Sequence, residues 1–440
     1  MGHKNADRVI VHLAAAAVML LFSAAPVMAA EPGTTLELQP LIDEALKNNH
    51  EVLVAGAKWQ AANARIKQAG SLPDPMVMIG YQNEGWSQYS YGKMEGAQWL
   101  YGISQMFPFP GKRALKEEMA GRDADTAAAM QAAARLTTEL RVKELYYDLF
   151  KVYKDLDLIR ERSALFGRIE EAALARYATG MAQQQEVLMA QTEKYMLLER
   201  EAMLKQKRQS LEAMLVSVVG REESAPLGRP VEPPATPLAA DVDDLVRQAL
   251  ERSPEVRSRE KMLGASQAGV QMARKEYYPD VTLAGTVLKR SGDYEDMWAL
   301  TATFNIPLYF KSRQGQAVAE SRARHSAAVH ELAGVKAMLA SGVRDNYAMV
   351  RSADELMILY RQGLLPKTMQ DVELSLAGYR TGKVEEITAI SRLKALIDYE
   401  LSYWAQFVER EKAIARIEAL TGGGGQPAAQ GEQQEPKEQN

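Results

Sequence analysis

Residues 297–306 read MWALTATFNI, and this stretch decides the fold class. Large apolar side chains, among them Trp298 and Leu300, alternate with small or polar ones such as Thr301 and Thr303. Successive side chains of a strand point to opposite faces, so the alternation predicts a β-strand between an apolar and a polar environment. A transmembrane barrel strand has this pattern, and so does a strand of a β-sandwich with one solvated face.

Three further stretches have a similar pattern, and the four expected strands form two pairs. The strands are expected at about 74–83 and 97–107 in the first pair and at about 280–289 and 297–307 in the second. Polar loops rich in Gly, Ser and Tyr separate the members of each pair. Four strands cannot close a barrel, since small outer-membrane barrels need about eight. Either the sheet packs against a soluble element, or several chains contribute strands to one barrel.

The chain contains an internal duplication with an offset of roughly 200 residues. The matching motifs are LIDEAL and LVRQAL at 41–46 and 245–250, LPD and YPD at 72–74 and 278–280, and YATG and YRTG at 177–180 and 379–382. Because the matches occur in the same order, we expect a first repeat at 31–220 and a second at 241–421. The segment between them, 221–240, is rich in proline, which excludes helix and predicts an extended strap.

Each repeat also contains a helix-forming stretch far longer than a globular helix. Residues 112–178 lack proline and are rich in Ala, Leu, Glu, Arg and Lys. Within them Leu149, Val152 and Leu156 are spaced by three and four, as in a coiled-coil seam. Such a helix would be roughly 100 Å long at about 1.5 Å per residue. We expect a matching helix at about 311–377, with shorter helices stacked end to end beside each long one to complete a rod.

The two ends of the chain have their own signatures. Lys4 and Arg8 precede an apolar stretch, and small residues at 27–29 offer a cleavage site, so residues 1–30 are predicted to be a secretory signal peptide. The tail at 422–440 begins with glycines and continues with Gln, Glu and Pro, which predicts disorder. No other apolar run approaches the ~20 residues of a spanning helix.

Composition argues against catalysis. The net charge of −4 gives no reason to expect a nucleic-acid partner. The absence of cysteine removes disulfides, thiolate metal sites and a thiol nucleophile together. The sequence contains no Ser-His-Asp signature, zinc motif or phosphate-binding loop. We therefore expect no enzyme, no catalytic residue, no cofactor and no dedicated metal site.

Methionine is the one soft ligand that the chain has in quantity, with 21 residues. Thioethers suit copper(I) or silver(I). Met189, Met196 and Met203 are seven residues apart, however, and this spacing predicts packing along a helix seam. Met76 and Met78 share one face of an expected strand and deserve more weight as ligands.

The ordered set of motifs resembles the TolC-type outer-membrane efflux family from about residue 38 to about residue 420. The resemblance rests on the tandem repeat, the Pro-Asp ahead of each first strand, the proline after each second strand and the Tyr-x-x-Gly turns. Residues 104–112, SQMFPFPGK, are similar to a corner in the heavy-metal (CzcC/CusC-like) branch. The resemblance implies a mainly α fold with a small β part. Four strands from each chain of a homotrimer would close a 12-stranded barrel, continued by an α-helical coiled-coil barrel.

The resemblance also implies the function and the partners. It predicts the exit duct of a tripartite efflux pump in the outer membrane, with a large periplasmic portion and with heavy-metal cations as a candidate cargo. The implied partners are outer-membrane lipid, a periplasmic adaptor (membrane fusion) protein and an inner-membrane pump of the RND type. Two alternatives stay open at this point. The duct of a type I protein-secretion system shares the architecture, and a structural periplasmic coiled coil would need the rod without the strands.

In this family the Tyr-x-x-Gly turns mark the periplasmic tip, where the adaptor docks. The corresponding residues are Tyr177, Gly180, Tyr379 and Gly382. Charged residues follow each turn, namely Glu186 in the first repeat and Lys383, Glu385 and Glu386 in the second. Three chains would bring rings of carboxylates together, which suits a cation-selective constriction at the entrance. The alternative is that acids in a first helical turn only complement the helix dipole.

Overall fold

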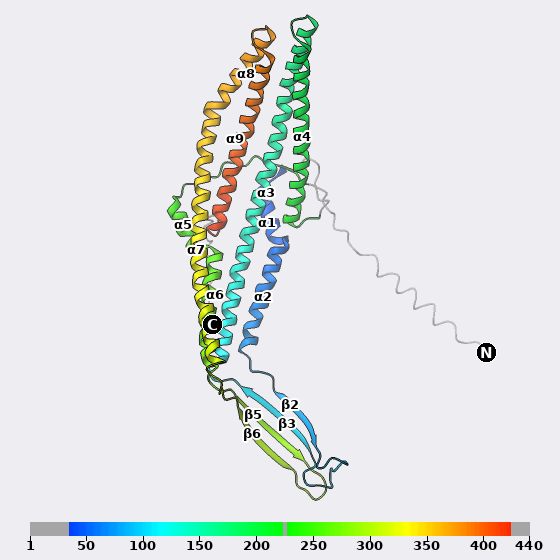
Figure 1. The fold of residues 1–440 in the computed structure, drawn as a ribbon, viewed down its shortest axis with the longest axis vertical. Helices are drawn as coiled ribbons and strands as arrows, with labels where there is room; N and C mark the ends of the chain where they lie inside the picture. The colour runs from blue at the N-terminus through cyan, green and yellow to red at the C-terminus, as the bar shows by residue number, and fades with distance from the viewer. Residues whose placement is uncertain (1–34, 223–226, 424–440) are drawn as a thin grey trace, which may run out of the picture.

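The structure, a computed structural model, describes residues 35–222 and 227–423 and is a long, narrow rod (Figure 1). Helices form most of its length, and a four-stranded sheet extends from one end (Figure 1). The predicted signal peptide and all but the first two residues of the predicted tail lie outside the described residues. No helix within the described ranges is long and apolar enough to cross a membrane.

The first repeat stacks two shorter helices beside one long helix. Its helices are α1 (Leu38–Asn48), α2 (His50–Gly70), α3 (Lys112–Ala178) and α4 (Gln184–Val219). The break between α1 and α2 lies at Asn49, whose side chain accepts hydrogen bonds from the backbone N–H groups of Glu51 at 2.8 Å and Val52 at 3.3 Å. These bonds satisfy two N–H groups that have no partner inside α2 and fix where it begins. α1, α2 and α4 all pack against α3, whose predicted seam residues Leu149, Val152 and Leu156 are buried.

The second repeat has the same order of elements, with its own long helix near the predicted 311–377. Its helices are α5 (Val242–Arg252), α6 (Pro254–Lys275), α7 (Gln314–Ile358), α8 (Leu365–Arg380) and α9 (Glu386–Leu420), with a π-helical turn, η1 (Leu359–Leu364), between α7 and α8. The long helix is unbroken from Gln314 to Arg380, but it contains this π-helical turn, and both of its ends lie three residues later than the approximate bounds expected. Pro366 has no N–H to donate, and the N–H of Leu365 reaches back five residues to the carbonyl of Tyr360.

The sheet joins the two repeats. Its strands are β2 (Met76–Gln82), β3 (Gln98–Phe107), β5 (Val281–Lys289) and β6 (Met297–Phe304), in the order β2-β3-β5-β6 with every neighbour antiparallel. Each lies within the predicted range, but β6 ends at Phe304, three residues before the predicted end at 307. β5 pairs with β3 along its whole length, from Trp99 to Phe107 of β3, so the two hairpins form one sheet whose edges are β2 and β6.

The proline-rich linker lies against the middle of the rod and contains no helix in its described part. A short strand in it, β4 (Arg229–Pro230), pairs in parallel with β1 (Thr35–Leu36). The Tyr146 hydroxyl of α3 donates to the carbonyl oxygen of Leu36 at 3.1 Å and is within 2.8 Å of that of Val231. These contacts hold the extended segment on α3.

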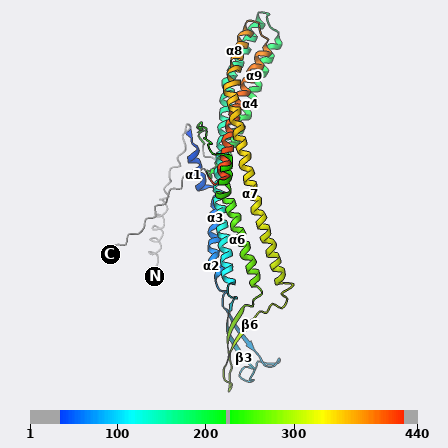
Figure 2. The ribbon, with the colours of Figure 1, turned by 90° about the vertical axis from the view of Figure 1, so that its left-hand side faces the viewer.

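The helices form a single layer rather than a globular core (Figure 2). Near the sheet, α3 packs between α2 and α6, and α6 packs on α7. Toward the other end, α3 packs between α4 and α9, and α9 packs on α7 and α8. The buried apolar residues accordingly form clusters along the rod. Met196 and Met203 were predicted to pack along a helix seam. In the single chain they do not, because α4 is at the edge of the layer and leaves these side chains 50% and 59% exposed.

Candidate functional site

The two Tyr-x-x-Gly turns lie at the end of the rod opposite the sheet, at the α3–α4 and α8–α9 junctions (Figure 1). Gly180 and Gly382 have φ angles of 70° and 75°, in the left-handed region that a β-carbon disfavours. In the first turn the N–H of Met181 donates to the carbonyl of Arg176 at 2.8 Å, and in the second that of Lys383 donates to Gly378 at 2.9 Å. This is the same glycine-dependent helix end built twice.

The two turns are joined by Arg176, which sequence reasoning missed. Its guanidinium donates to the carbonyl of Tyr379 at 2.7 Å and to that of Met181 at 3.1 Å. It also lies over the Tyr379 ring, with the guanidinium carbon 4.8 Å from the ring centroid. A charged donor on two carbonyls makes stronger hydrogen bonds than a neutral one, so Arg176 fixes the two hairpins to each other.

Three of the predicted residues meet beneath these turns, although they come from three helices. The Tyr379 hydroxyl donates to the carboxylate of Glu186 at 3.2 Å. Glu186 is held by a capping box at the start of α4, where its other oxygen accepts from the N–H of Gln183 at 3.4 Å. Tyr379 is fully buried, and burial together with the charges of Glu386 and Glu186 raises its pKa. The phenol is therefore a neutral hydrogen-bond donor.

Glu386 is the most perturbed acid of this group. The residue is 3% exposed, and among the described residues no side chain donates a hydrogen bond to its carboxyl group, to which only the backbone N–H of Ala190 comes close. Burial, with a smaller contribution from the charge of Glu186, raises the pKa of Glu386 to about 7. The backbone N–H of Ala190 and the charge of Arg176 oppose this rise in pKa only in part. A carboxyl group at the tip thus changes its charge close to neutral pH.

The remaining predicted residues do not enter this cluster. Lys383 and Glu385 are exposed, and Glu385 is the N-terminal capping residue of α9. Tyr177 is 48% exposed, unlike its counterpart Tyr379. The duplicated motif therefore has two different environments: one tyrosine is available to a partner, and the other is part of the interior of the tip. The sequences of the two copies already differ at this point, because Arg176 precedes Tyr177 whereas Gly378 precedes Tyr379.

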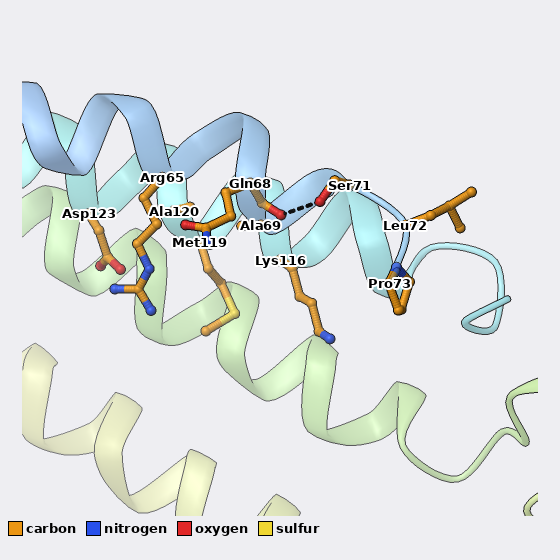
Figure 3. Close-up of a pocket in the computed structure, with 10 residues that line it drawn as sticks. All are labelled: Arg65, Gln68, Ala69, Ser71, Leu72, Pro73, Lys116, Met119, Ala120 and Asp123. Carbon is orange, nitrogen blue, oxygen red and sulfur yellow. Dashed lines mark hydrogen bonds between the residues drawn. The ribbon is translucent and has the colours of Figure 1, made fainter. Parts of the chain in front are cut away.

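A second concave region lies where the helices meet the sheet (Figure 3). It is lined by α2, the start of α3 and the connection at Ser71, Leu72 and Pro73. Arg65 and Lys116 are its cationic groups, and Asp123 is its acid. These charges are mixed, and the one hydroxyl among the lining residues, that of Ser71, donates to the carbonyl of Gln68 at 2.7 Å. Across the described ranges no group of three or more His, Cys, Asp or Glu side chains could hold a metal ion.

Comparison with known proteins decides the family. The model of the family described as "Outer membrane efflux protein" matches residues 41–221 and 245–390, which is most of the chain and follows the two repeats. The chain belongs to this family. It is therefore an outer-membrane efflux channel with a large periplasmic helical part, and not an enzyme. Channels of the family are trimeric and work with an adaptor and an inner-membrane pump.

Individual relatives are distant but extend over almost the whole channel. The chain is 22% identical to the outer membrane protein OprJ of Pseudomonas aeruginosa over 417 residues, covering 88% of this chain and 84% of OprJ. It is 22% identical to the cobalt-zinc-cadmium resistance protein CzcC of Cupriavidus metallidurans, covering 91% and 93%. Among solved structures, the outer membrane protein VceC of Vibrio cholerae superimposes with a TM-score of 0.75 at 18% identity, covering 88% and 96%. This chain and VceC therefore have the same fold.

Proposed function

We propose that three copies of this efflux channel assemble into one continuous duct and that the copies join along the edges of the layer. The observation that carries the proposal is the open sheet, whose edge strands β2 and β6 have unpaired backbone groups along one side. One chain supplies four strands, so three chains supply the 12 of a closed barrel, well above the minimum of about eight. The single layer of helices continues the sheet in the same direction. Its edges would therefore meet the helical edges of the neighbouring copies, as the edges of the sheet do.

The apolar face of the sheet is assigned to outer-membrane lipid. Val77, Tyr101, Val287 and Leu300 lie on this face and are 47% to 77% exposed in the single chain. Apolar side chains exposed to this extent are costly in water and are stabilised in hydrocarbon. The opposite face, with its threonines and serine, then faces the lumen.

The tip is assigned to recruitment and gating. Tyr177 and Gly180 of one turn and Tyr379 and Gly382 of the other would form the adaptor-docking surface, with the exposed Tyr177 in direct contact with the adaptor. The charged residues Glu186, Lys383, Glu385 and Glu386 would surround the entrance, Lys383 and Glu385 at the surface and the two others behind it. Arg176 and the Tyr379–Glu186 hydrogen bond hold the hairpins together until the adaptor engages.

The pump that feeds the duct is proposed to be of the RND type, and heavy-metal cations are the candidate cargo. CzcC is by its name a cobalt-zinc-cadmium resistance protein, and its match extends over 91% of this chain. Rings of carboxylates at the entrance would favour cations over anions.

The assembly is tested by the mass of the detergent-extracted protein. We expect native mass spectrometry to give three copies, and substitution of Ile79 on β2 by proline, which cannot extend the ladder, to reduce the trimer. Ile103→Pro would not serve as a control, because β3 pairs with both β2 and β5 and a proline there would disrupt the sheet within one chain. Ile79→Val, which keeps the backbone donor, is the matched control. A stable monomer in the unaltered protein would contradict the proposal.

A further inference from the structure

The apolar face of the sheet stops, at the end away from the helices, in a row of aromatic and charged side chains. Tyr81 of β2 lies opposite Trp99 of β3, and Trp99 lies opposite Lys289 of β5. All three are on the face that also carries Val77 and Leu300, because side chains two residues apart share a face. Counted along the strands from the helices, Lys289 is the first charged residue on this face. The row therefore marks where the apolar surface stops.

The length of this apolar surface fits the lipid layer to which it is assigned. On β3 it extends from Phe107, next to the helices, to Trp99, eight residues away. Eight steps of about 3.4 Å make roughly 27 Å of strand, and a barrel tilt of about 40° reduces this to roughly 21 Å along the membrane normal. The apolar band of outer-membrane barrels is about 25 Å tall. Residues beyond Trp99 accordingly lie at the level of the lipid headgroups.

The loop between β2 and β3 adds aromatic side chains to this row. It projects sideways from the end of the sheet rather than continuing the strands (Figure 1 and Figure 2). The ring of Tyr89 stacks on that of Tyr81 with centroids 5.1 Å apart, and the ring of Tyr91 meets Tyr81 edge-on at 6.4 Å. Tyr81 in turn packs against Trp99 at 5.1 Å. The loop is therefore continuous with the apolar face.

Asn83 holds this loop in a defined shape. Its side-chain amide donates to the carbonyls of Gly85 at 2.8 Å and Gln88 at 2.9 Å. Its side-chain oxygen accepts from the backbone N–H of Ser90 at 2.9 Å. Trp86 lies between the first two of these contacts and is wholly exposed. A loop that is already ordered loses little conformational entropy when its exposed indole binds a surface.

The exposed part of the loop has the composition of a membrane interface. Residues 85–92, GWSQYSYG, contain no charged side chain, and the charged residues Glu84, Lys93 and Glu95 flank this stretch. Trp and Tyr combine an apolar ring with one polar group, so they favour the boundary between hydrocarbon and headgroups. Packing within the chain does not account for Trp86, because it buries none of its surface there.

We propose that the β2–β3 loop, residues 83–96, is a lipid anchor that places Trp86 and Tyr89 in the headgroup layer of the outer leaflet. The anchor rests on the proposed duct and adds to it a contact that fixes how deep the barrel sits in the membrane. Each copy of the chain provides one anchor, so a trimer is held at three points around its barrel. The β5–β6 loop, which reads DYED at 293–296, is acidic and stays in water.

The test uses the absence of cysteine, because a single introduced cysteine then carries a nitroxide label at one known place. Ser87→Cys labels an exposed position beside Trp86, with Val77→Cys on the apolar face and Glu295→Cys on the β5–β6 loop as references. The full-length protein is reconstituted into vesicles of phosphatidylethanolamine and phosphatidylglycerol. Electron paramagnetic resonance then measures how often each label collides with a water-soluble nickel chelate. We expect collisions to be severalfold rarer at Ser87 than at Glu295.

Trp86→Ser shows whether the indole holds the loop at the membrane. Trp86 is wholly exposed, so the variant keeps the core of the protein and should make the Ser87 label severalfold more accessible to nickel. Tyr294→Ser removes an aromatic ring from the other loop and is the matched control, which should leave the Ser87 label unchanged. A Ser87 label as accessible as the Glu295 label, or unaffected by Trp86→Ser, would overturn the anchor.

The Val77 label separates the failure of the anchor from the failure of the duct. A Val77 label that nickel reaches freely would contradict the assignment of the apolar face to lipid. A shielded Val77 label together with a freely accessible Ser87 label would refute the anchor alone.

Discussion

Glu386→Gln is the perturbation whose effect the structure defines most closely. The carboxyl is 3% exposed, and burial and the neighbouring charge of Glu186 raise its pKa to about 7 from 4.5. The folded tip therefore binds this proton more tightly than the unfolded chain does, and its stability falls as the pH rises from about 4.5 through 7. At about 1.4 kcal/mol for each pH unit, a rise of the pKa from 4.5 to about 7 means that the ionised form costs at most about 3.5 kcal/mol per chain at pH 8.

Glutamine resembles the protonated acid and removes this cost. We expect hydrogen exchange in α8 and α9 near the tip to be slower in the variant than in the unaltered protein at pH 8, and equal in the two at pH 5. Comparing the proteins at the same pH removes the intrinsic pH dependence of exchange. Glu385→Gln is the control, because Glu385 is exposed and one residue away, and it should leave the exchange unchanged. Equal effects of Glu386→Gln at pH 5 and pH 8, or faster exchange at pH 8, would refute the reasoning.

Four further substitutions test the tip and the junction of the helices with the sheet. Tyr379→Ala removes a fully buried ring and should reduce the free energy of unfolding by about 3–5 kcal/mol, seen as a clearly lower melting temperature. Tyr177→Ala removes an exposed ring, so it should cost under about 1 kcal/mol of stability but weaken adaptor binding in a pull-down. Gly382→Ala should cost about 1–2 kcal/mol by the same melting assay, because φ is 75° and a β-carbon is strained there although it would have space. Lys112→Ala should destabilise the junction of helices and sheet by about 3–5 kcal/mol, since the buried amine lies 2.9 Å from Asp280, which would lose its charged partner and keep only the N–H of Phe109. An unchanged melting curve would contradict this.

Much of the fold was accessible from the sequence because its elements are unusually long and regular. The proline-free stretch at 112–178 predicts α3 with both ends correct, and the alternation at 297–306 predicts β6 and its apolar face. The second long helix was predicted less well. Pro366 was visible in the sequence, but the pattern cannot show that a π-helical turn accommodates it while α7 and α8 continue in one direction.

The tip was only partly predictable. The turns identify themselves by their glycines, but Glu186, Tyr379 and Glu386 are brought together by packing between repeats that are far apart in the sequence. Nothing in the pattern distinguishes the exposed Glu385 from its buried neighbour Glu386, because that difference depends on which side of α9 faces α4. Arg176 was missed for the same reason, since its partners belong to two different turns.

Single-channel conductance in planar bilayers would show whether this chain forms a conducting duct with an acidic entrance. The purified protein, with its oligomeric mass checked beforehand, should give discrete openings that select cations over anions. Glu385→Gln should reduce that selectivity, because it removes an exposed carboxylate from every chain at the proposed entrance. A protein that inserts as a trimer but shows no openings, or openings that prefer anions and do not respond to Glu385→Gln, would contradict the account.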